Sequence, residues 1–245
     1  MDYSKFDYDK DNDYLEDHDV ANHGSYKYYI SLFEDYIKQP FAEIGAGVGT
    51  VSSLLLENNI LDPDHSYLIE PNATIFPQLT TRAEAAGFKK NNLFQGTLSQ
   101  LHSNLPKLKT LLYFNVLEHI ENDISELRLA YNALDSGGRV IIFVPAIETL
   151  YSPRDLRVGH YRRYYKEELV RKLSLAGFEV EKISYTDFIG AVIWFFRFKL
   201  IRSDSVSNHQ VALYNTFIVP INKFIEKIIP LPYGKNCIAI AKKIG

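Results

Sequence analysis

The stretch FAEIGAGVGTVSSLL, residues 41–55, decides the fold of this chain. Apolar residues lead into three glycines at alternate positions, Gly45, Gly47 and Gly49, and an apolar pattern with helical spacing follows them. Glycine admits the backbone angles of a tight turn, and such a turn points free N–H groups and the positive end of a helix toward a ligand. The stretch therefore predicts a strand, a turn and a helix that bind a nucleotide-like cofactor.

Strand-like and helix-like segments alternate along most of the chain, which is typical of βαβ units and a largely parallel sheet. The expected strands are 41–44, 66–69, 92–95, 110–114, 139–144 and 237–241, and the expected helices are 26–37, 50–58, 75–86, 123–134 and 166–176. We expect Gly137 to supply the left-handed cap that ends the helix at 123–134. Gly177 is expected to end the helix at 166–176.

The composition excludes several classes of protein. A chain of 245 residues with 46% hydrophobic residues can bury a large core. The net charge of −3 and the lack of a long Lys/Arg run argue against nucleic acid as a partner. The single cysteine, Cys237, excludes an internal disulfide. Residues 1–25 form an acidic extension without the apolar run of a signal peptide, so we expect a cytoplasmic protein.

Two further features bear on the identity of the cofactor. The glycines follow the pattern Gly-x-Gly-x-Gly, since Thr50 stands where a pyrophosphate-binding turn would place its third glycine. This spacing disfavours NAD. Glu70 ends the second expected strand, where an acid can accept hydrogen bonds from both ribose hydroxyls of either NAD or an adenosyl cofactor.

These features belong to a wider resemblance. EIGAGVGT at 43–50, NVLEHI at 115–120 and SGGRVII at 136–142 resemble the class I S-adenosylmethionine-dependent methyltransferases. GHYRRY at 159–164 and PYGKNCIA at 232–239 are similar to a bacterial subfamily often associated with polysaccharide or glycolipid genes. The resemblance covers about residues 26–243 and implies an α/β Rossmann-like sheet, mostly parallel, with an antiparallel last strand at its edge. It places the methyltransferase domain at 26–245, with a helical insertion at 189–229.

The resemblance also implies which residues hold the cofactor, S-adenosylmethionine, and its product S-adenosylhomocysteine. The implied cofactor residues are Glu43, Gly45, Ala46, Gly47, Glu70, Pro71, Gly96, Thr97, Asn115 and Val116. Two positions depart from the family pattern, because Thr97 and Lys109 stand where many members carry Asp. The resemblance therefore supports the predicted contacts to adenine less well than the other cofactor contacts.

Methylation of a hydroxyl needs a base to remove its proton, and histidine suits that role. His119 and His160 both follow expected strands on the side where open α/β sheets bind their ligands. We assign His160 as the base and His119 as a residue that shapes the pocket, with a structural role open for either. Glu118, His119 and His160 also resemble the metal ligands of some methyltransferases, although Asn115 replaces the first expected Glu, so a divalent metal stays an open alternative.

The segment YSPRDLRVGHYRRYY, residues 151–165, places four arginines among aromatic residues. Arginine grips carboxylates or phosphates bidentately, and aromatic rings stack on sugars, which favours an anionic saccharide or a sugar on a phosphate. The predicted acceptor residues are Tyr151, Asp155, Arg162 and Arg163. The alternative is a solvated loop in which an arginine pairs with Asp155.

The insertion begins with FIGAVIWFFRFKLIR at 188–202, which is too short and too charged to span a bilayer. It has the mixture of aromatic and basic residues found in helices that lie on a membrane surface. If the segment lies on a membrane, the protein is expected at the inner membrane face. The alternative is that the segment packs on the sheet or against a second copy in a homodimer.

The sequence thus predicts an S-adenosylmethionine-dependent methyltransferase that acts on a hydroxyl of a saccharide, either a small molecule or lipid-linked. Two alternatives stay open. One is an NAD-dependent sugar-modifying enzyme, disfavoured by the glycine spacing and by the lack of a Tyr-x-x-x-Lys pair. The other is a non-catalytic scaffold that binds a partner through the helices at 189–229.

Overall fold

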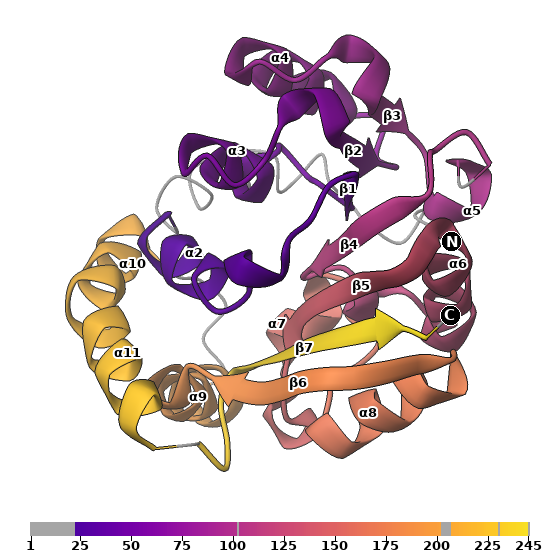
Figure 1. Ribbon diagram of the computed structural model, residues 1–245. Coiled ribbons are helices and arrows are strands. Elements are labelled where there is room, and N and C mark those ends of the chain that lie inside the picture. The colour runs from indigo at the N-terminus through magenta and orange to yellow at the C-terminus, as the bar shows by residue number, and fades with distance from the viewer. Residues whose placement is uncertain (1–22, 102, 202–206, 230, 245) are drawn as a thin grey trace.

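A seven-stranded sheet forms the centre of the protein, in the order β3-β2-β1-β4-β5-β7-β6 (Figure 1). The computed structural model describes residues 23–101, 103–201, 207–229 and 231–244, so almost all of the predicted acidic extension lies outside it. The strands are β1 Phe41–Ile44, β2 Ser66–Glu70, β3 Leu93–Gln95, β4 Leu108–Phe114, β5 Leu134–Pro145, β6 Phe178–Thr186 and β7 Asn236–Lys243. All neighbours pair in parallel except β7, which is antiparallel to both β5 and β6.

Helices cover both faces of this sheet. They are α2 His23–Ile30, α3 Thr50–Glu57, α4 Phe76–Ala86, α5 Leu98–Leu101, α6 Asp123–Ala133, α7 Pro153–Arg157, α8 Lys166–Leu175, α9 Phe188–Trp194, α10 Asn208–Leu213 and α11 Val219–Ile228. Leu111 and Tyr113 of β4 pack in one core with α6 and α8, whereas Leu112 and Phe114 pack in the other with α2, α3 and α4. This alternation buries β4 on both faces, as the continuous apolar run at 110–114 predicts.

The fold class is as predicted, but two local predictions about helix ends were wrong. The helix expected at 26–37 stops at Ile30 and is followed by a separate 3-10 turn at Glu34–Tyr36. Gly137 does not cap α6, because the helix ends at Ala133 and Leu134 already pairs with Leu108 of β4. Gly137, with a φ of +72°, lies within β5 instead.

The last strand, β7, is antiparallel as predicted but does not lie at the edge of the sheet. It pairs with β5 on one side and with β6 on the other, so β6 is the edge strand. The sequence analysis did not predict β6 at all, because a half-exposed edge strand such as FEVEKISYT lacks the long apolar run of the inner strands.

The helical insertion lies between β6 and β7, beyond the carboxyl ends of the parallel strands and beside α2 (Figure 1). It consists of α9 and α10–α11, with π-helical turns at Phe195–Leu200 and Tyr214–Ile218. Asp187 anchors it, because its buried carboxylate accepts hydrogen bonds from Tyr29 of α2 (3.0 Å), from Tyr214 and from Asn222 of α11 (2.6 Å).

Lys235 supplies the counter-charge for this anchor, with its Nζ 2.9 Å from the Asp187 carboxylate. Burial opposes ionisation of Asp187, but Lys235 and the hydroxyl of Tyr214 outweigh it and hold the pKa of the carboxyl below its usual value. One buried charge, that of Asp187, therefore joins α2, the insertion and Lys235, the residue directly before β7.

Candidate functional site

The glycine turn has the geometry of a ligand cradle. Gly45, Gly47 and Gly49 all have positive φ, at +67°, +57° and +85°. At Gly45 a Cβ atom would lie 2.6 Å from a methyl group of Val116, so this glycine permits close packing of two loops. At Gly47 a Cβ would meet nothing within 4 Å, which leaves the backbone open to a ligand.

Glu70 lies directly across from this turn. Its carboxylate accepts hydrogen bonds from the backbone N–H of Gly47 (2.9 Å) and of Asn72 (2.8 Å), and burial raises its pKa. The contact with Asn72 is the capping role of a structural acid, whereas the contact with Gly47 joins the end of β2 to the glycine turn. Glu43 is buried and accepts a hydrogen bond from Ser52, so its side chain fastens α3 to β1.

The other predicted cofactor residues also lie at the carboxyl ends of the parallel strands. Ala46 is in the glycine turn, Pro71 follows β2, Gly96 and Thr97 follow β3, and Asn115 and Val116 follow β4. Asn115 has a positive φ of +54°, and its N–H donates to the carbonyl of Phe143 (2.8 Å). This strained backbone turns the chain sharply at the end of β4.

A cavity of about 480 Å³ adjoins Asn115, between the end of the sheet and the helical insertion. Its lining includes Tyr26 and Tyr29 of α2, Glu118, Arg154, Asp155, His160 and Arg163 of the loops after β4 and β5, and Trp194, Arg197, Phe198, Val211 and Tyr214 of the insertion. Aromatic rings make up much of its wall, and cationic side chains outnumber acids. Such a cavity suits an anionic molecule with a ring.

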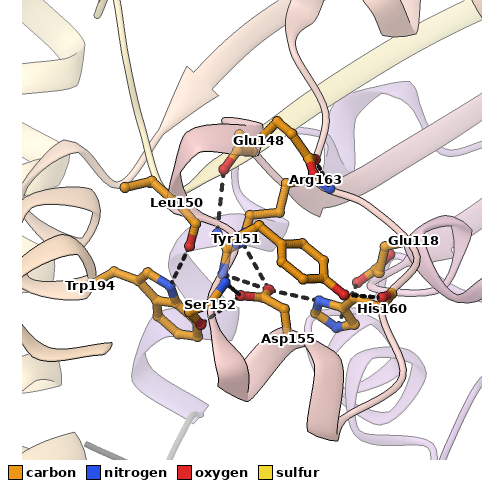
Figure 2. Close-up of polar contacts among 10 residues, drawn as sticks. Glu118, Glu148, Leu150, Tyr151, Ser152, Asp155, His160, Arg163 and Trp194 are labelled. Atoms are coloured by element: carbon orange, nitrogen blue, oxygen red, sulfur yellow. Dashed lines mark hydrogen bonds and ion pairs between the residues drawn. The ribbon is translucent and has the colours of Figure 1, made fainter. Parts of the chain in front are cut away.

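His160 is held in this cavity in a defined orientation (Figure 2). Its Nδ1 lies 2.9 Å from Asp155 Oδ1. Burial alone would raise the pKa of the Asp155 carboxyl, but the hydrogen bond from His160 and the charge of Arg163 hold it at about 2. Because Asp155 is ionised it can only accept, so Nδ1 of His160 carries a proton and donates it. In a neutral ring Nε2 then has a free lone pair.

Burial also lowers the pKa of His160, although the hydrogen bond to Asp155 acts in the opposite direction. His160 is therefore neutral near pH 7. Its Nε2 faces Glu118 Oε1 across 3.9 Å, which is too long for a hydrogen bond. No atom fits between them at this separation, but a ligand oxygen beside the pair could lie within hydrogen-bond distance of both.

Glu118 is the most unusual group in the site. Its side chain is fully buried, and neither carboxylate oxygen has a hydrogen-bond partner among the described residues. Burial raises the pKa of Glu118 to about 8, despite the nearby charge of Arg163. A buried carboxyl without a partner is costly, so its retention beside the cavity points to a ligand that satisfies it.

His119 completes the cluster. Its ring lies edge-on to that of His160, with the ring centres 4.7 Å apart. Burial, together with the adjacent His160, lowers the pKa of His119 to about 3, so this ring is also neutral. Ligand atoms of Glu118, His119 and His160 all lie within 4.8 Å of one another, which brings the three predicted metal ligands together.

Only some residues of the GHYRRY segment face the cavity. Others bond to residues 120–123, next to Glu118 and His119. Arg162 turns away from the cavity and donates to the carbonyl oxygens of Ile120 (2.8 Å) and Glu121 (2.7 Å) and to Asp123 (2.9 Å). Tyr164 also donates to Asp123 (2.9 Å). Arg162 is absent from the cavity lining, so this geometry gives no support to its predicted contact with the acceptor.

Arg163 lines the cavity but is already engaged. Its guanidinium is 1% exposed, pairs with Asp155 through Nε and Nη2 (both 2.8 Å) and stacks over the ring of Trp194 at 4.5 Å. Ser152 donates to the other oxygen of Asp155 through its N–H (2.9 Å) and its hydroxyl (2.8 Å). The Arg–Asp155 pair raised as an alternative is therefore present, and it positions His160.

Tyr151 lies beside His160, since its hydroxyl donates to the carbonyl of His160 (2.6 Å), but it is absent from the cavity lining. The sequence analysis missed Trp194, Phe198 and Lys235 as lining residues of the cavity. Trp194 is the chain's single tryptophan, and its Nε1 donates to the carbonyl of Leu150 (3.2 Å). A lone tryptophan near a basic run is the sequence signal that points to this wall of the cavity.

Comparisons with known proteins agree with this geometry at the level of the fold. No protein-family model and no curated protein matches the chain. The structure is similar to an S-adenosylmethionine-dependent methyltransferase from Archaeoglobus fulgidus, at 22% identity over 88% of this chain and 91% of that chain, with a TM-score of 0.58. A possible histamine N-methyltransferase from Thermotoga maritima is 17% identical over 96% of this chain and 97% of its own, with a TM-score of 0.64.

A third similar structure is the cyclase SpnF, 16% identical over 84% of this chain and 75% of its own, with a TM-score of 0.52. The chain therefore has the fold of S-adenosylmethionine-dependent methyltransferases. Because a cyclase has a similar fold, the reaction must be argued from the residues of the site.

Proposed function

We propose that the protein is an S-adenosylmethionine-dependent methyltransferase that methylates a hydroxyl group of a saccharide or glycolipid. The observation that carries this proposal is the neutral His160, whose Nε2 faces a cavity that begins at the cofactor edge of the sheet. The glycine turn fits the cofactor, because Gly47 is open on its Cβ side and Glu70 lies across from it.

The chemistry divides between the cofactor and the chain. When bound, S-adenosylmethionine would supply a methyl group on a sulfonium, so that attack of an acceptor oxygen on the methyl carbon, in line with the breaking C–S bond, would release neutral S-adenosylhomocysteine. The hydroxyl of the acceptor loses its proton to Nε2 of His160 as its oxygen gains the methyl group. Asp155 stabilises the imidazolium that results, since its carboxylate already accepts the proton on Nδ1. The helical insertion and α2 surround the acceptor and exclude water.

The lining of the cavity supports a saccharide that carries negative charge. Tyr26, Tyr29 and Trp194 contribute aromatic rings to the wall, and Arg154 and Arg197 bring positive charge to it. A small soluble saccharide and a lipid-linked one present the same chemistry to this wall. The proposal therefore covers polysaccharide or glycolipid modification.

Calorimetric titration with S-adenosylmethionine, S-adenosylhomocysteine and NAD tests the cofactor. We expect micromolar binding of the first two and none of NAD; the reverse pattern would favour the sugar-modifying NAD enzyme. Transfer of a labelled methyl group to anionic saccharides and to glycolipid extracts then tests the reaction. Cofactor binding without methylation of any acceptor pool would favour the non-catalytic scaffold.

A divalent metal at Glu118, His119 and His160 is a competing use of the same atoms. The cluster fits a cation, because Glu118 has an unsatisfied buried carboxyl and Asp155 orients His160 as acids orient metal-binding histidines. A bound cation would hold Nε2 of His160 and so prevent it from acting as the base. Turnover that is equal in chelator-treated protein with and without magnesium or manganese favours the base; turnover that needs the added metal favours the cation.

A further inference from the structure

The outer side of the helical insertion carries a row of exposed apolar side chains on α10, its π-helical turn and α11. We call this row the outer stripe. It consists of Leu213, Phe217, Ile221, Phe224 and Ile228, which are between 45% and 68% exposed. Intervals of three and four residues place them on one side of the helix. Among the described residues, the only exposed large apolar side chains that fall outside 192–233 are Leu156, Tyr161, Leu175 and Ile244.

This helix is turned the opposite way to an ordinary surface helix. Helices on globular proteins direct their apolar side to the core and their polar side to water. Here the side that faces inward carries polar groups beside the buried Val211 and Val219: Tyr214 and Asn222 bond to Asp187, and Glu226 accepts from Thr186 (2.6 Å) and from the N–H of Asp187 (2.7 Å).

Rotation of the helix to hide the stripe would break these bonds around a buried carboxylate. That would leave Asp187 and its partners unsatisfied in the interior, which is strongly unfavourable. The exposure of the outer stripe is therefore fixed by the fold, and exposed apolar areas of this kind mark interaction surfaces.

The charges beside the outer stripe indicate the kind of partner. Lys223 and Lys227 are exposed on α11, the helix that carries Ile221, Phe224 and Ile228 of the stripe. Among residues 188–201 and 207–229, Glu226 is the only acid, and it bonds inward. The whole chain has a net charge of −3, so this region is locally basic on an acidic protein.

We infer that the outer stripe docks on the surface of a bilayer that contains anionic lipids. The apolar side chains enter the boundary of the acyl chains while the lysines contact the headgroups. Within the described ranges no helix is both long and apolar enough to cross a bilayer, which agrees with a helix that lies on the surface. A second copy is a poorer partner, because a two-fold dimer through the stripe brings the same lysines together.

The same helices connect this surface with the cavity. Trp194, Phe198, Val211 and Tyr214 line the cavity from the inner side of the insertion whose outer side carries the stripe. A saccharide on a lipid anchor would therefore be held close to the cavity while its anchor stays in the bilayer. The delivery of a lipid-linked saccharide to the cavity rests on the proposed function, whereas the docking of the stripe on a bilayer does not.

Flotation of the full chain with lipid vesicles tests the docking without cofactor or acceptor. Two kinds of vesicle are compared, pure phosphatidylcholine and an equal mixture of phosphatidylcholine and phosphatidylglycerol. We expect binding to the mixed vesicles that weakens as salt is raised. The double variant Lys223→Gln with Lys227→Gln should bind about 25-fold more weakly, since each lysine near an anionic surface contributes roughly fivefold.

The double variant Phe217→Ser with Phe224→Ser should abolish flotation, whereas Leu175→Ser, an exposed leucine of α8 outside the stripe, should leave it unchanged. Circular dichroism of each variant checks that the fold is retained. Wild-type protein that floats with neither vesicle overturns the inference, as does a stable dimer in sedimentation that the Phe217→Ser and Phe224→Ser changes dissociate. Since flotation needs no turnover, its failure leaves the proposed function untouched.

Discussion

Replacing Glu118 by glutamine tests the most unusual electrostatic feature of the site. Glu118 is fully buried without a hydrogen-bond partner among the described residues, and its pKa is raised to about 8 from an ordinary value of 4.5. A raised pKa means that the folded protein binds this proton more tightly than the unfolded chain does. The stabilisation is complete below pH 4.5 and is lost as the pH rises to 8.

Between those values the free energy of unfolding should fall by about 1.4 kcal/mol per pH unit from this group alone. From pH 5 to pH 7 the loss is therefore roughly 2–3 kcal/mol. Glu118→Gln has almost the same shape and cannot ionise, so it should lack this loss. Its stability relative to the wild type should rise by the same roughly 2–3 kcal/mol over that range.

Urea unfolding of both proteins at several pH values between 5 and 8, with chelator present, measures the difference. Because the comparison is between two proteins at each pH, the titration of groups that do not interact with Glu118 cancels. Parallel stability curves for wild type and Glu118→Gln would refute the reasoning, since they would mean that Glu118 is ionised and satisfied in the folded protein.

Three further predictions concern other parts of the molecule. His160→Asn should lower kcat by about 10²–10⁴-fold with little change in the affinity for S-adenosylmethionine, since it removes only the base; an unchanged kcat would exclude that role. Gly47→Val should weaken the binding of S-adenosylmethionine at least about tenfold in calorimetry, because it adds bulk where the cofactor approaches. Gly87→Val, at an equally open glycine with a φ of +106°, is the matched control and should leave the affinity unchanged. Asp187→Ala should destabilise the protein by about 3–5 kcal/mol in urea unfolding, since Lys235 would lose its buried partner; a loss below about 1 kcal/mol would contradict the anchoring role.

The sequence by itself determined the parts of the protein that depend on local backbone geometry. Glycines at 45, 47 and 49 permit positive φ at no steric cost, and all three have it. The strand at Phe41–Ile44 has the bounds that its apolar run predicts. The alternation of strands and helices then fixed a parallel sheet with its ligand edge at the glycine turn.

The tertiary structure alone decided features that depend on distant partners. Leu134 joins β5 because Leu108 lies beside it, and β7 lies inside the sheet because β6 pairs with its far side. No local pattern near residue 137 or 178 reveals those neighbours. The same applies to Arg162, whose guanidinium donates to the carbonyl oxygens of Ile120 and Glu121 and to Asp123, about 40 residues earlier in the sequence.

The orientation of α11 shows the same division most clearly. Its amphipathic pattern is readable from the sequence, and that pattern alone predicts an apolar side packed on the core. The buried carboxylate of Asp187 reverses this, because Tyr214 and Asn222 must face it to satisfy the charge. Periodicity specifies which residues share a side of a helix, but the pairing of buried polar groups decides which side faces the protein.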